Sequence, residues 1–472
     1  MYLPDRNNYS SLKIKKLNKE SNANKIARWL KNSITARMFT IGVLTLVLLI
    51  PLAMVEDLIK ERSERKQSIV TEINDKWGEA VTIYGPVLKI PYRYFREKQI
   101  TNSENGITTE SIEEIKHLYL FPHELKINSN IDPEMKKHGI YKTVVYKSTS
   151  ELKGVFSISA LQNEDIPEEN FLWKKAKIIL NTSNLKGVNE QMNIEFNDEK
   201  YSFSTKYQRQ DRKPLTGKEL YLMESEALAE IEINKNIPLE FKMKVSINGS
   251  SEISFVPIGK TTEAIMKSDW KTNSFKGNFL PYNDDKITET GFNAKWKILD
   301  INRPFPQVFE NYLPDLTEYA FGVNLMVPVD EYQKSERATK YGFLVIGLTF
   351  LLFFLIQTIS KIPIHPFQYL MLGLGLVMFY TLLISISEHS TFLKAYLIAG
   401  FSVILMVSFY SKSILAGWKF PLFIGTSLLA LYSFIYIIIQ LESYALLVGS
   451  IGLFMILAGV MYASRKIDWN NY

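Results

Sequence analysis

Residues 38–55, MFTIGVLTLVLLIPLAMV, form a stretch of eighteen residues without a charged side chain. As a helix this stretch would be about 27 Å long, close to the roughly 30 Å hydrocarbon core of a bilayer. We therefore predict a transmembrane span. A cleaved signal peptide is the alternative, but signal peptides have shorter apolar cores and a small residue before the cleavage point. Because the sequence AMVE at 53–56 is a poor cleavage site, we expect an uncleaved anchor.

The residues before this span are strongly basic. Residues 1–37 contain nine Lys or Arg residues against two acidic residues, Asp5 and Glu20. A basic segment beside a span favours the cytoplasmic side of a bacterial inner membrane, where anionic lipids attract it. The overall net charge of +6 reflects this segregation. No nucleic-acid fold accompanies these charges, so we expect the lipid bilayer, and not nucleic acid, as the partner.

Five further apolar windows occupy the C-terminal part of the chain. They are Tyr341–Ile359, Phe367–Ile386, Phe392–Tyr410, Phe420–Ile439 and Tyr444–Tyr462. The breaks between them alternate in charge, with Lys361, Lys412 and Lys419 in one set and Glu388 and Glu442 in the other. By the positive-inside rule, this alternation places both termini in the cytoplasm and the middle of the chain outside.

The middle of the chain has the pattern of a β domain. Residues 56–76 continue the first span as an amphipathic helix, but the apolar period then changes. Apolar residues alternate with polar ones from Leu239 to Ile247, which predicts a strand with one buried face. Similar alternation recurs at 140–146, 177–180, 193–196 with 201–205, and 319–329. After Asn248-Gly249 an odd-length loop would pair Val245 with Ile253, so we predict a hairpin there.

The predicted fold is thus a membrane protein with an α-helical bundle of about six spans, one N-terminal and five C-terminal, plus a large, mainly antiparallel β domain. Its predicted parts are a cytoplasmic basic tail at 1–37, a span at 38–55, a periplasmic β-rich domain at 56–338, a five-span bundle at 341–462 and a cytoplasmic tail at 463–472. A β domain of this size can bury a core without disulfides, and the chain contains no cysteine.

Enzyme and metal motifs are missing from the sequence. The absence of cysteine excludes disulfides, thiolate metal sites and cysteine nucleophiles. No nucleophile-elbow, Walker, Rossmann or zincin motif is present. His117, His123 and His138 lie in one region, but no ligand spacing or flanking acidic cluster accompanies them. We therefore predict no cofactor, no metal and no enzymatic activity.

Several strings rich in aromatic residues, glycine and proline stand out. They are Trp77-Gly78, Gly85–Tyr92, Gly139–Tyr146, Ser274–Pro281, Gly291–Trp296, Asn302–Gln307, Phe321–Val323, Pro328–Tyr332, His365–Tyr369 and Ser387–His389. In order and spacing they resemble the CreD family of bacterial inner-membrane proteins, which are described as cell envelope integrity proteins. The resemblance runs from about Arg62 to the last span. It departs from the family pattern at Val81, His138 and Asn273.

The resemblance implies an inner membrane protein linked to envelope stress, with tolerance of toxins or antibiotics in some members and no established reaction. It also marks a set of residues of unknown role. These are Trp77, Gly85, Pro86, Gly139, Tyr141, Trp296, Arg303, His365, Pro366, Gln368, Tyr369, Glu388 and His389.

Most of these residues have a structural explanation. Gly-Pro fixes a turn, and an aromatic residue beside glycine packs over a strand. His365, Glu388 and His389 are the strongest functional candidates, because ionisable groups next to lipid are costly and often functional. At the ends of spans, however, they can simply reach water. His365-Pro366 also fits the start of a helix, with proline in its first turn.

Three functions remain open from the sequence. The leading hypothesis is a non-enzymatic protein supporting envelope integrity or the stress response, in which a periplasmic β domain binds an envelope protein or component and is coupled to the bundle. A transporter or channel for a small envelope-related substrate is the alternative, although the spans hold few ionisable residues and no evident inverted repeat. An envelope-modifying enzyme would need a catalytic constellation that the sequence does not show.

Overall fold

The structure is a computed structural model that describes residues 34–101, 107–206, 219–229, 238–325, 331–415, 417–441 and 444–465. It divides into two compact units, a helical unit of residues 1–66 with 329–472 and a β domain of residues 67–328. Of the two predicted tails, residues 1–33 and 466–472 lie outside the described residues. Each unit is described by itself below.

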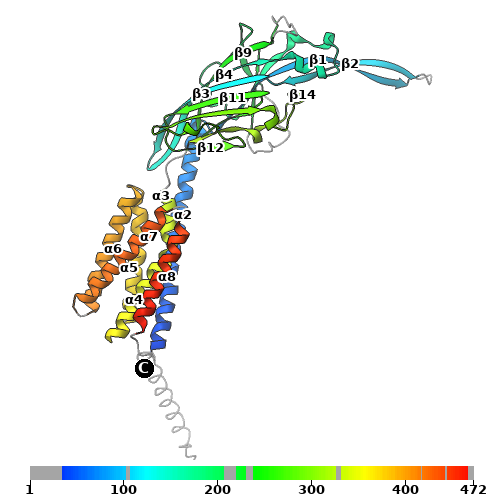
Figure 1. Ribbon diagram of the computed structural model, residues 1–472. Coiled ribbons are helices and arrows are strands. Elements are labelled where there is room, and N and C mark those ends of the chain that lie inside the picture. The colour runs from blue at the N-terminus through cyan, green and yellow to red at the C-terminus, as the bar shows by residue number, and fades with distance from the viewer. Residues whose placement is uncertain are drawn as a thin grey trace, which may run out of the picture. The chain divides into compact units, whose positions relative to one another are not determined.

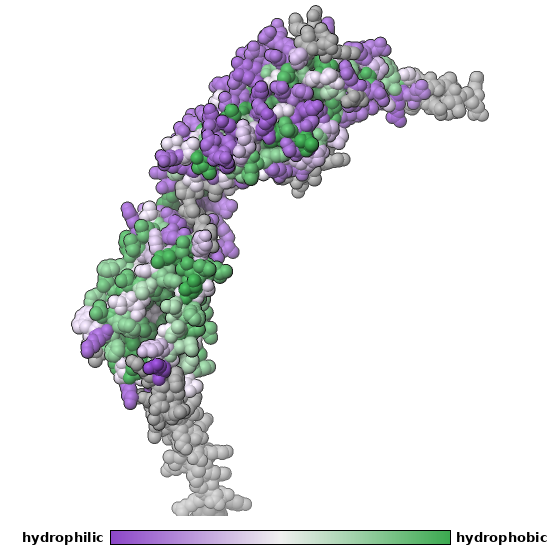
Figure 2. Space-filling model, viewed as in Figure 1, coloured by the Kyte–Doolittle hydropathy of each residue, from purple (hydrophilic) through white to green (hydrophobic). Residues whose placement is uncertain are grey.

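The described part of the helical unit contains six helical segments long and apolar enough to cross a membrane, as the sequence predicts (Figure 1). The helices are α2 (Ile34–Trp77), α3 (Glu331–Lys340), α4 (Gly342–Ser360), α5 (Pro366–Ser387), α6 (Phe392–Ile414), α7 (Lys419–Gln440) and α8 (Ala445–Ser464). Helices α3 and α4 together make one of the six segments. Pro51 lies inside α2, which continues without a break through the predicted amphipathic stretch. Figure 2 shows an apolar surface over this unit and a mainly hydrophilic surface over the β domain.

Helix α2 packs against the bundle through leucine and glycine. Leu48 is 1% exposed, and a Cβ atom added at Gly373 of α5 would lie 2.0 Å from its Cδ1 atom. Leu52 approaches Gly342, the first residue of α4, in the same way. Small residues let helix backbones approach closely where no water drives association. The two glycines therefore fix where α2 lies along α4 and α5.

The described part of the β domain contains fifteen strands. They are β1 (Val81–Thr101), β2 (Ile107–Leu120), β3 (Glu124–His138), β4 (Tyr141–Phe156), β5 (Lys177–Thr182), β6 (Asn193–Phe196), β7 (Glu199–Lys206), β8 (Tyr221–Ser225), β9 (Leu239–Ser250), β10 (Glu252–Phe255), β11 (Thr261–Ser268), β12 (Asn273–Gly277), β13 (Phe292–Leu299), β14 (Val308–Glu310) and β15 (Phe321–Leu325). Short 3₁₀ turns connect several of them. All strand pairs are antiparallel except β1 with β10 and β3 with β11.

The strands form one continuous sheet that curls around a single core. Its order is β12-β15-β10-β1-β5-β8-β7-β6-β9-β4-β3-β11-β13, with β2 beside β1 and β14 beside β2. The two ends of this order meet, because Phe275 of β12 packs edge-on against Trp296 of β13 at 5.8 Å. One hydrophobic cluster contains residues from most of the strands, from Val81 to Leu325.

The sequence predicted the faces of strands better than their partners. The alternation from Leu239 onward is confirmed by the burial of every second side chain of β9. The alternation predicted at 193–196 and 201–205 corresponds to β6 and β7, which pair with each other in antiparallel order. The pairing of Val245 with Ile253 is wrong. Strand β9 pairs with β4, and β10 pairs with β1 and β15, because the chain turns at Ser251 (φ 56°) into a different part of the sheet.

The glycine at position 373 offers a test of how α2 packs. We expect Gly373→Ala to destabilise the full-length protein in detergent by about 1–3 kcal/mol, because the added methyl group overlaps the buried Leu48 side chain. Gly347→Ala in α4 is the matched control, since nothing lies within 4 Å of its added Cβ atom. Both changes raise helix propensity equally, so their difference isolates packing. Thermal aggregation of both variants is measured by size-exclusion chromatography. Equal midpoints for Gly373→Ala and Gly347→Ala would contradict the contact between Leu48 and Gly373.

Candidate functional site

Four residues at one end of the helical unit form what we term the Glu388 cluster: Arg62, Glu331, Tyr332 and Glu388. The Arg62 Nε atom of α2 lies 3.7 Å from Glu388 Oε1. The Tyr332 hydroxyl of α3 donates to the same oxygen at 3.2 Å. The Glu388 side chain is 14% exposed, so water contributes little to its solvation there. The cluster therefore joins α2, α3 and the end of α5 through one carboxylate.

The local folding of the chain explains how these groups meet. Glu388 follows the last turn of α5, and its backbone N–H still donates to Ile384. Glu331 begins α3, and its Oε2 accepts from the backbone N–H of Phe392 at 3.0 Å, in the first turn of α6. A carboxylate at this position favourably meets the positive end of a helix dipole. Glu331 and Glu388 thus tie the α5–α6 connection to α3.

Of the motif Ser387–His389, the structure brings only Glu388 into the cluster. His389 is exposed, and no hydrogen bond or ion pair joins its side chain to the described residues. Lys394 lies near Glu388 in the sequence, but the cation that contacts Glu388 in the structure is Arg62 of α2. Sequence analysis did not select Arg62 as a site residue and included Tyr332 only as the end of the motif Pro328–Tyr332, although a carboxylate beside lipid requires a cation from some element.

The motif His365–Tyr369 lies where α4 leads into α5, at the opposite end of α5 from Glu388. His365 caps α5: its Nδ1 accepts from the Phe367 N–H at 3.2 Å, and Gln368 Oε1 accepts from the His365 N–H at 2.8 Å. Pro366 occupies the first turn, as predicted for a helix start. Buried Tyr369 donates to Gln357 Oε1 of α4 at 2.8 Å. These bonds fix the α4–α5 connection.

In the β domain, Gly85 and Pro86 make a bulge in β1. The pairing of β1 with β5 shifts register between Tyr84 and Val87. Gly85 has φ 146°, and a side chain there would meet the carbonyl oxygen of Ile179. Only glycine suits both conditions. This motif is therefore structural, as the sequence indicated.

Trp296 and Arg303 hold the β domain together from inside. Trp296 is 2% exposed, packs on Phe275 and Phe321, and donates from Nε1 to the Phe279 carbonyl at 3.0 Å. Arg303 is 5% exposed and donates from Nη2 to the Gly259 carbonyl at 3.1 Å. Burial lowers the Arg303 pKa to about 10. Each side chain spans elements far apart in sequence, which accounts for its place in a motif.

Trp77 and the Gly139–Tyr141 string lie close together at the last turn of α2 and the β3–β4 hairpin. The Lys136 ammonium lies 4.7 Å from the centre of the Trp77 ring. Gly139 turns the hairpin with φ 60°, and Tyr141 is buried at the start of β4. The three histidines considered for a metal are separated here on β2, the β2–β3 connection and β3. Among the described residues no group of three potential ligands is close enough to bind a metal ion.

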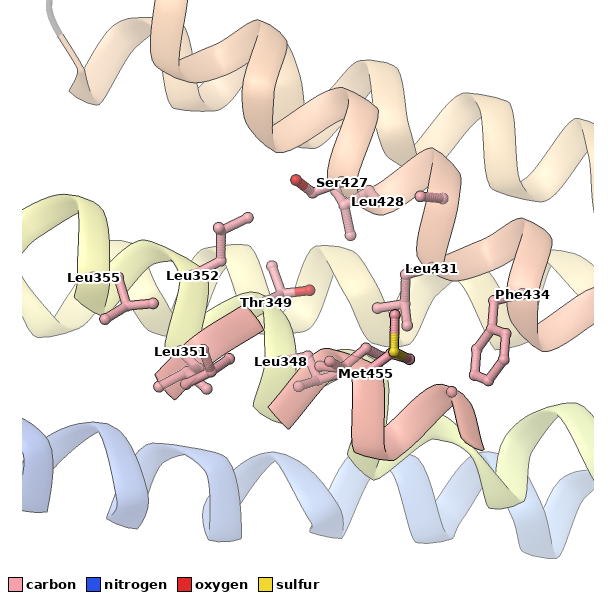
Figure 3. Close-up of a pocket in the computed structure, with 14 residues that line it drawn as sticks. Leu348, Thr349, Leu351, Leu352, Leu355, Ser427, Leu428, Leu431, Phe434 and Met455 are labelled. Carbon is pink, nitrogen blue, oxygen red and sulfur yellow. The ribbon is translucent and has the colours of Figure 1, made fainter. Parts of the chain in front are cut away.

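An apolar cavity of about 490 Å³ lies between α4, α7 and α8 (Figure 3). Its polar lining consists of two hydroxyl groups, those of Thr349 and Ser427, and the other lining side chains are mainly leucine, with Met455 and Phe434 among them. The Ser427 hydroxyl donates to the Phe423 carbonyl. Such a lining suits hydrocarbon and not an ion or a polar substrate.

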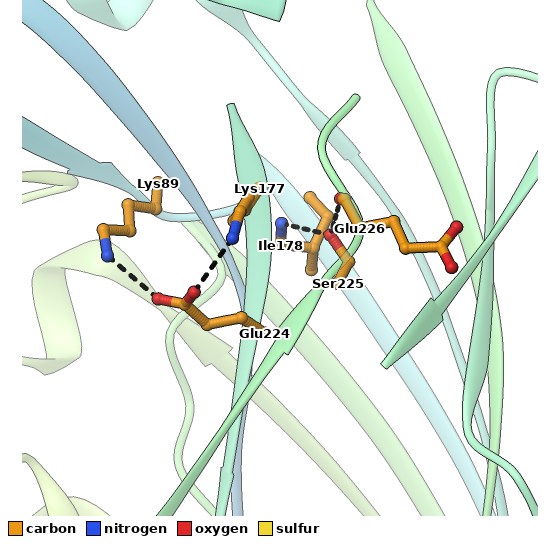
Figure 4. A network of polar contacts seen from close by, with 6 residues as sticks. All are labelled: Lys89, Lys177, Ile178, Glu224, Ser225 and Glu226. Atoms are coloured by element: carbon orange, nitrogen blue, oxygen red, sulfur yellow. Dashed lines mark hydrogen bonds and ion pairs between the residues drawn. The ribbon is translucent and has the colours of Figure 1, made fainter. Parts of the chain in front are cut away.

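A second group of polar contacts lies inside the β domain (Figure 4). Lys89 of β1 and Lys177 of β5 are direct cross-strand neighbours. Glu224 of β8, 8% exposed at its side chain, lies between them at 2.9 Å and 3.3 Å from the two ammonium groups. Two like charges opposite each other would destabilise the sheet, and the shared carboxylate offsets their repulsion. Ser225 beside it accepts from the Ile178 N–H at 2.9 Å.

Comparison with known proteins supplies the family. The family model described as "Inner membrane protein CreD" matches residues 33–470. The chain belongs to the CreD family. It is 31% identical over 447 residues to the inner membrane protein CreD of Escherichia coli (strain K12), an alignment that covers 93% of this chain and 94% of that protein. The resemblance seen in the sequence motifs is thereby confirmed, and the six apolar segments are those of a multi-pass inner membrane protein.

The CreD family name describes a location and not a reaction. Of the motif residues, Gly85, Pro86, Trp296 and Arg303 have structural roles in the β domain, as shown above. Among the motif residues marked as of unknown role, those whose polar side chains join different helices are Glu388 and Tyr369. Glu388 is the one that contacts a cation, so the Glu388 cluster is the candidate functional site.

The Lys89–Glu224–Lys177 group predicts a dependence of stability on acid. Burial opposes ionisation of Glu224, but the hydrogen bonds and charges of the two lysines outweigh it and hold its pKa below 4.5. A carboxyl group with a lowered pKa in the folded state stabilises that state at neutral pH. The contribution begins to fall near pH 4.5 and disappears as pH falls through the folded-state pKa.

Glu224→Gln should therefore lower the free energy of unfolding at pH 7 by roughly 1.5–3 kcal/mol and flatten the loss of stability below pH 4.5. Urea unfolding of the full-length protein in detergent, followed by circular dichroism, measures both effects. Glu151→Gln is the control, because Glu151 is 36% exposed in its pairs with Lys153 and Lys242. An equal loss of unfolding free energy in both variants would show that the burial of Glu224 does not increase its contribution to stability.

Proposed function

We propose that this CreD-family protein supports envelope integrity without catalysis, by binding an envelope component through a periplasmic β domain that is coupled to the helical bundle. Both termini lie in the cytoplasm, as the charge alternation predicts. The Glu388 cluster supports this proposal most directly.

The cluster contains residues from both of the chain segments that connect the two units, Arg62 from one and Glu331 and Tyr332 from the other. Helix α2, which carries Arg62, continues along the chain into the β domain. Helix α3, which carries Tyr332, follows the last strand of that domain after residues 326–330. Both side chains meet Glu388 Oε1. A displacement of either connection would therefore change the contacts of the same carboxylate, which lies between α5 and α6.

The surface that we propose for binding is a ribbon formed by β1 and β2. From Arg93 outward the two described strands pair with each other alone, and they project from the domain (Figure 1). The ribbon exposes apolar side chains, with Phe95 51% and Ile115 54% exposed. Its strand edges offer unpaired backbone groups, which are the usual template for an added strand. The occupant that fits is an extended segment of an envelope protein.

Transport has weaker support. The cavity between α4, α7 and α8 is lined mainly by apolar side chains, with the hydroxyl groups of Thr349 and Ser427 as its polar lining. A polar envelope precursor or an ion would lose its hydration there without replacement. The charged groups of the Glu388 cluster are paired with each other and cap helices, which suits mechanical connection better than passage.

Exchanging the charges of Arg62 and Glu388 tests the coupling. From the proposed role in envelope integrity, cells that lack the protein should be sensitive to detergent. Arg62→Glu and Glu388→Arg should each fail to restore their resistance, because like charges then face each other. The double variant should restore it. In detergent, the double-mutant cycle should give a favourable coupling of about 1 kcal/mol.

Lys76→Glu is the control for this experiment, since it disrupts the exposed Glu72–Lys76 pair on the same helix. Exposed pairs of this kind contribute little, so this variant should restore resistance fully. If the double variant fails as completely as the single ones while all remain in the membrane, the contact between Arg62 and Glu388 does not carry the function.

A photo-crosslinking amino acid at Phe95 tests the binding surface. In intact cells it should give a discrete adduct with an envelope protein, because this side chain lies on the free ribbon. The same amino acid at Tyr282, which is 66% exposed elsewhere on the domain, is the control and should give none. Adducts of equal yield at both positions, or an adduct at Tyr282 alone, would exclude the ribbon as the specific surface.

A further inference from the structure

A pocket of about 410 Å³ lies in the β domain, where the connection between β2 and β3 meets the start of β14. Its lining comes from parts of the segments 121–123, 157–164 and 306–308 and from Lys260. All of these belong to the β domain. The last segment includes the end of the motif Asn302–Gln307, to which the function proposed above gives no role. Pockets of this size are typical of small-molecule sites.

Backbone hydrogen bonds hold the walls of this pocket together. The Phe121 N–H donates to the Gln307 carbonyl at 2.9 Å. The His123 N–H donates to the Val155 carbonyl, at the end of β4, at 2.7 Å. The Lys260 N–H donates to a carbonyl of the same β2–β3 connection at 2.9 Å. The connection thus joins the other three walls, and the pocket is formed before any ligand enters.

Arg303 fixes two of these walls against each other. Its Nη1 atom donates to the Phe305 carbonyl at 2.9 Å, and its Nη2 atom donates to the Gly259 carbonyl at 3.1 Å. Phe305 leads into Pro306, and Gly259 precedes Lys260. Arg303 itself does not line the pocket. It is therefore a positioning residue for this pocket, which gives its motif a role beyond the core.

Several polar side chains in the lining remain available to a ligand. No hydrogen bond or ion pair joins the side chains of His123, Glu164 or Lys260 to the residues that the structure describes. The hydroxyl oxygens of Ser157 and Ser159 lie 2.7 Å apart, and each can bond a further group. Because the backbone groups of the walls are already paired, the pocket recognises a ligand through these side chains.

The polar lining supplies both donors and acceptors. The Lys260 ammonium group only donates, the Glu164 carboxylate only accepts, and hydroxyl groups can do both. Glu164 and Lys260 carry opposite charges, so the lining favours neither an anion nor a cation. A neutral ligand with several hydroxyl groups matches this lining, because each of its hydroxyls can donate and accept.

The rest of the lining is mainly apolar. It includes Phe121, Ala160, Pro306 and Val308. A sugar ring has hydroxyl groups around its edge and C–H groups on its faces, so it matches both parts of the lining. A short peptide has weaker support, because its terminal charges gain little from an exposed partner such as Lys260.

We propose that this pocket binds a neutral sugar unit. Glu164 accepts from one ring hydroxyl, Lys260 donates to another, and a face of the ring lies against Ala160 and Val308. Such a unit occurs in an envelope glycan and as a free sugar. The pocket does not include the ribbon of β1 and β2 beyond Arg93, so the site does not depend on what the ribbon binds.

Saturation-transfer difference NMR of the full-length protein tests the proposal. The protein is held in dodecylphosphocholine micelles, because a detergent with a sugar headgroup would compete for the pocket. The probes are N,N′-diacetylchitobiose, glucose and the dipeptide dialanine. At least one of the two sugars should receive more saturation than dialanine at equal concentration. Tighter binding of the disaccharide assigns the source to a glycan, and tighter binding of glucose assigns it to a free sugar.

Variants of the lining locate the binding. Glu164→Ala should weaken binding of the preferred sugar roughly tenfold, as expected for loss of a charge-assisted hydrogen bond. Glu164→Gln keeps a carbonyl acceptor and should weaken it less. Lys260→Met removes the ammonium group, keeps an apolar stem and should weaken binding severalfold. Asp165→Ala is the matched control, because it removes the neighbouring exposed carboxylate, which does not line the pocket. It should bind the sugar as the native protein does.

Three results would overturn the proposal. The first is saturation of dialanine equal to or greater than that of both sugars. The second is an equal loss of sugar binding in Glu164→Ala and Asp165→Ala, which would indicate a general effect of surface charge. The third is unchanged sugar binding in both Glu164→Ala and Lys260→Met, which would place the sugar elsewhere on the protein.

Discussion

The structure depends on hydrocarbon contact along its helices. None of the apolar window of α8 is buried within the protein, and only 17% of that of α2 is buried. Leu446 of α8 is 87% exposed and Phe454 is 70% exposed. In water these side chains would oppose folding, whereas in lipid their exposure costs nothing. The position of α8 is thus maintained by the bilayer and by its contact with α7, which distinguishes it from the well-buried α4 and α5.

The same constraint decides where polar groups can lie. In the helical unit, the polar interactions that join different helices concentrate at the helix ends, at the Glu388 cluster and at the Gln357–Tyr369 pair. An exception is the Tyr396 hydroxyl, which donates to the Tyr432 carbonyl between α6 and α7. In the β domain, by contrast, water surrounds the sheet, and a buried ion group such as Lys89–Glu224–Lys177 needs only local compensation. The chain thus places few charged groups where it meets lipid and many where it meets water.

The spans and strand faces were predictable because each depends on local periodicity. An uncharged stretch of eighteen residues and an alternating run can each be recognised without knowing which segment they pack against or pair with. Strand partners were not predictable in the same way. Thr82 of β1 and Ser254 of β10 hydrogen-bond across 172 residues, and nothing in the residues between them specifies a parallel pair. The predicted hairpin after Asn248-Gly249 failed because a nearby partner was assumed where the sheet supplies a distant one.

The candidate site could be predicted only in part, because local sequence identifies a residue but not its distant partner. The cost of a carboxylate beside lipid identified Glu388, because that cost is a property of one residue and its neighbours. The identity of its partner depends on where α2 lies against α5, and that is set by the contacts of Leu48 with Gly373 and of Leu52 with Gly342. Glycines in spans are common, so their role in placing Arg62 has no signature in the sequence.

Helix α2 has a polar contact at each end of its path along the bundle. Arg37 lines a pocket together with His365 at the start of α5, and Arg62 pairs with Glu388 just after the end of α5. Twenty-five residues of helix separate the two arginines, about 37 Å, which exceeds the roughly 30 Å hydrocarbon core and places both at its edges. A slide of α2 by one helical turn, about 5.4 Å, would remove Arg62 from Glu388 and move Arg37 within its pocket at the same time. Because Leu48 meets Gly373 between these two points, such a slide must also cross a close-packed contact, so intermediate positions are disfavoured. The geometry therefore resists gradual movement of α2 and makes the two ends respond together.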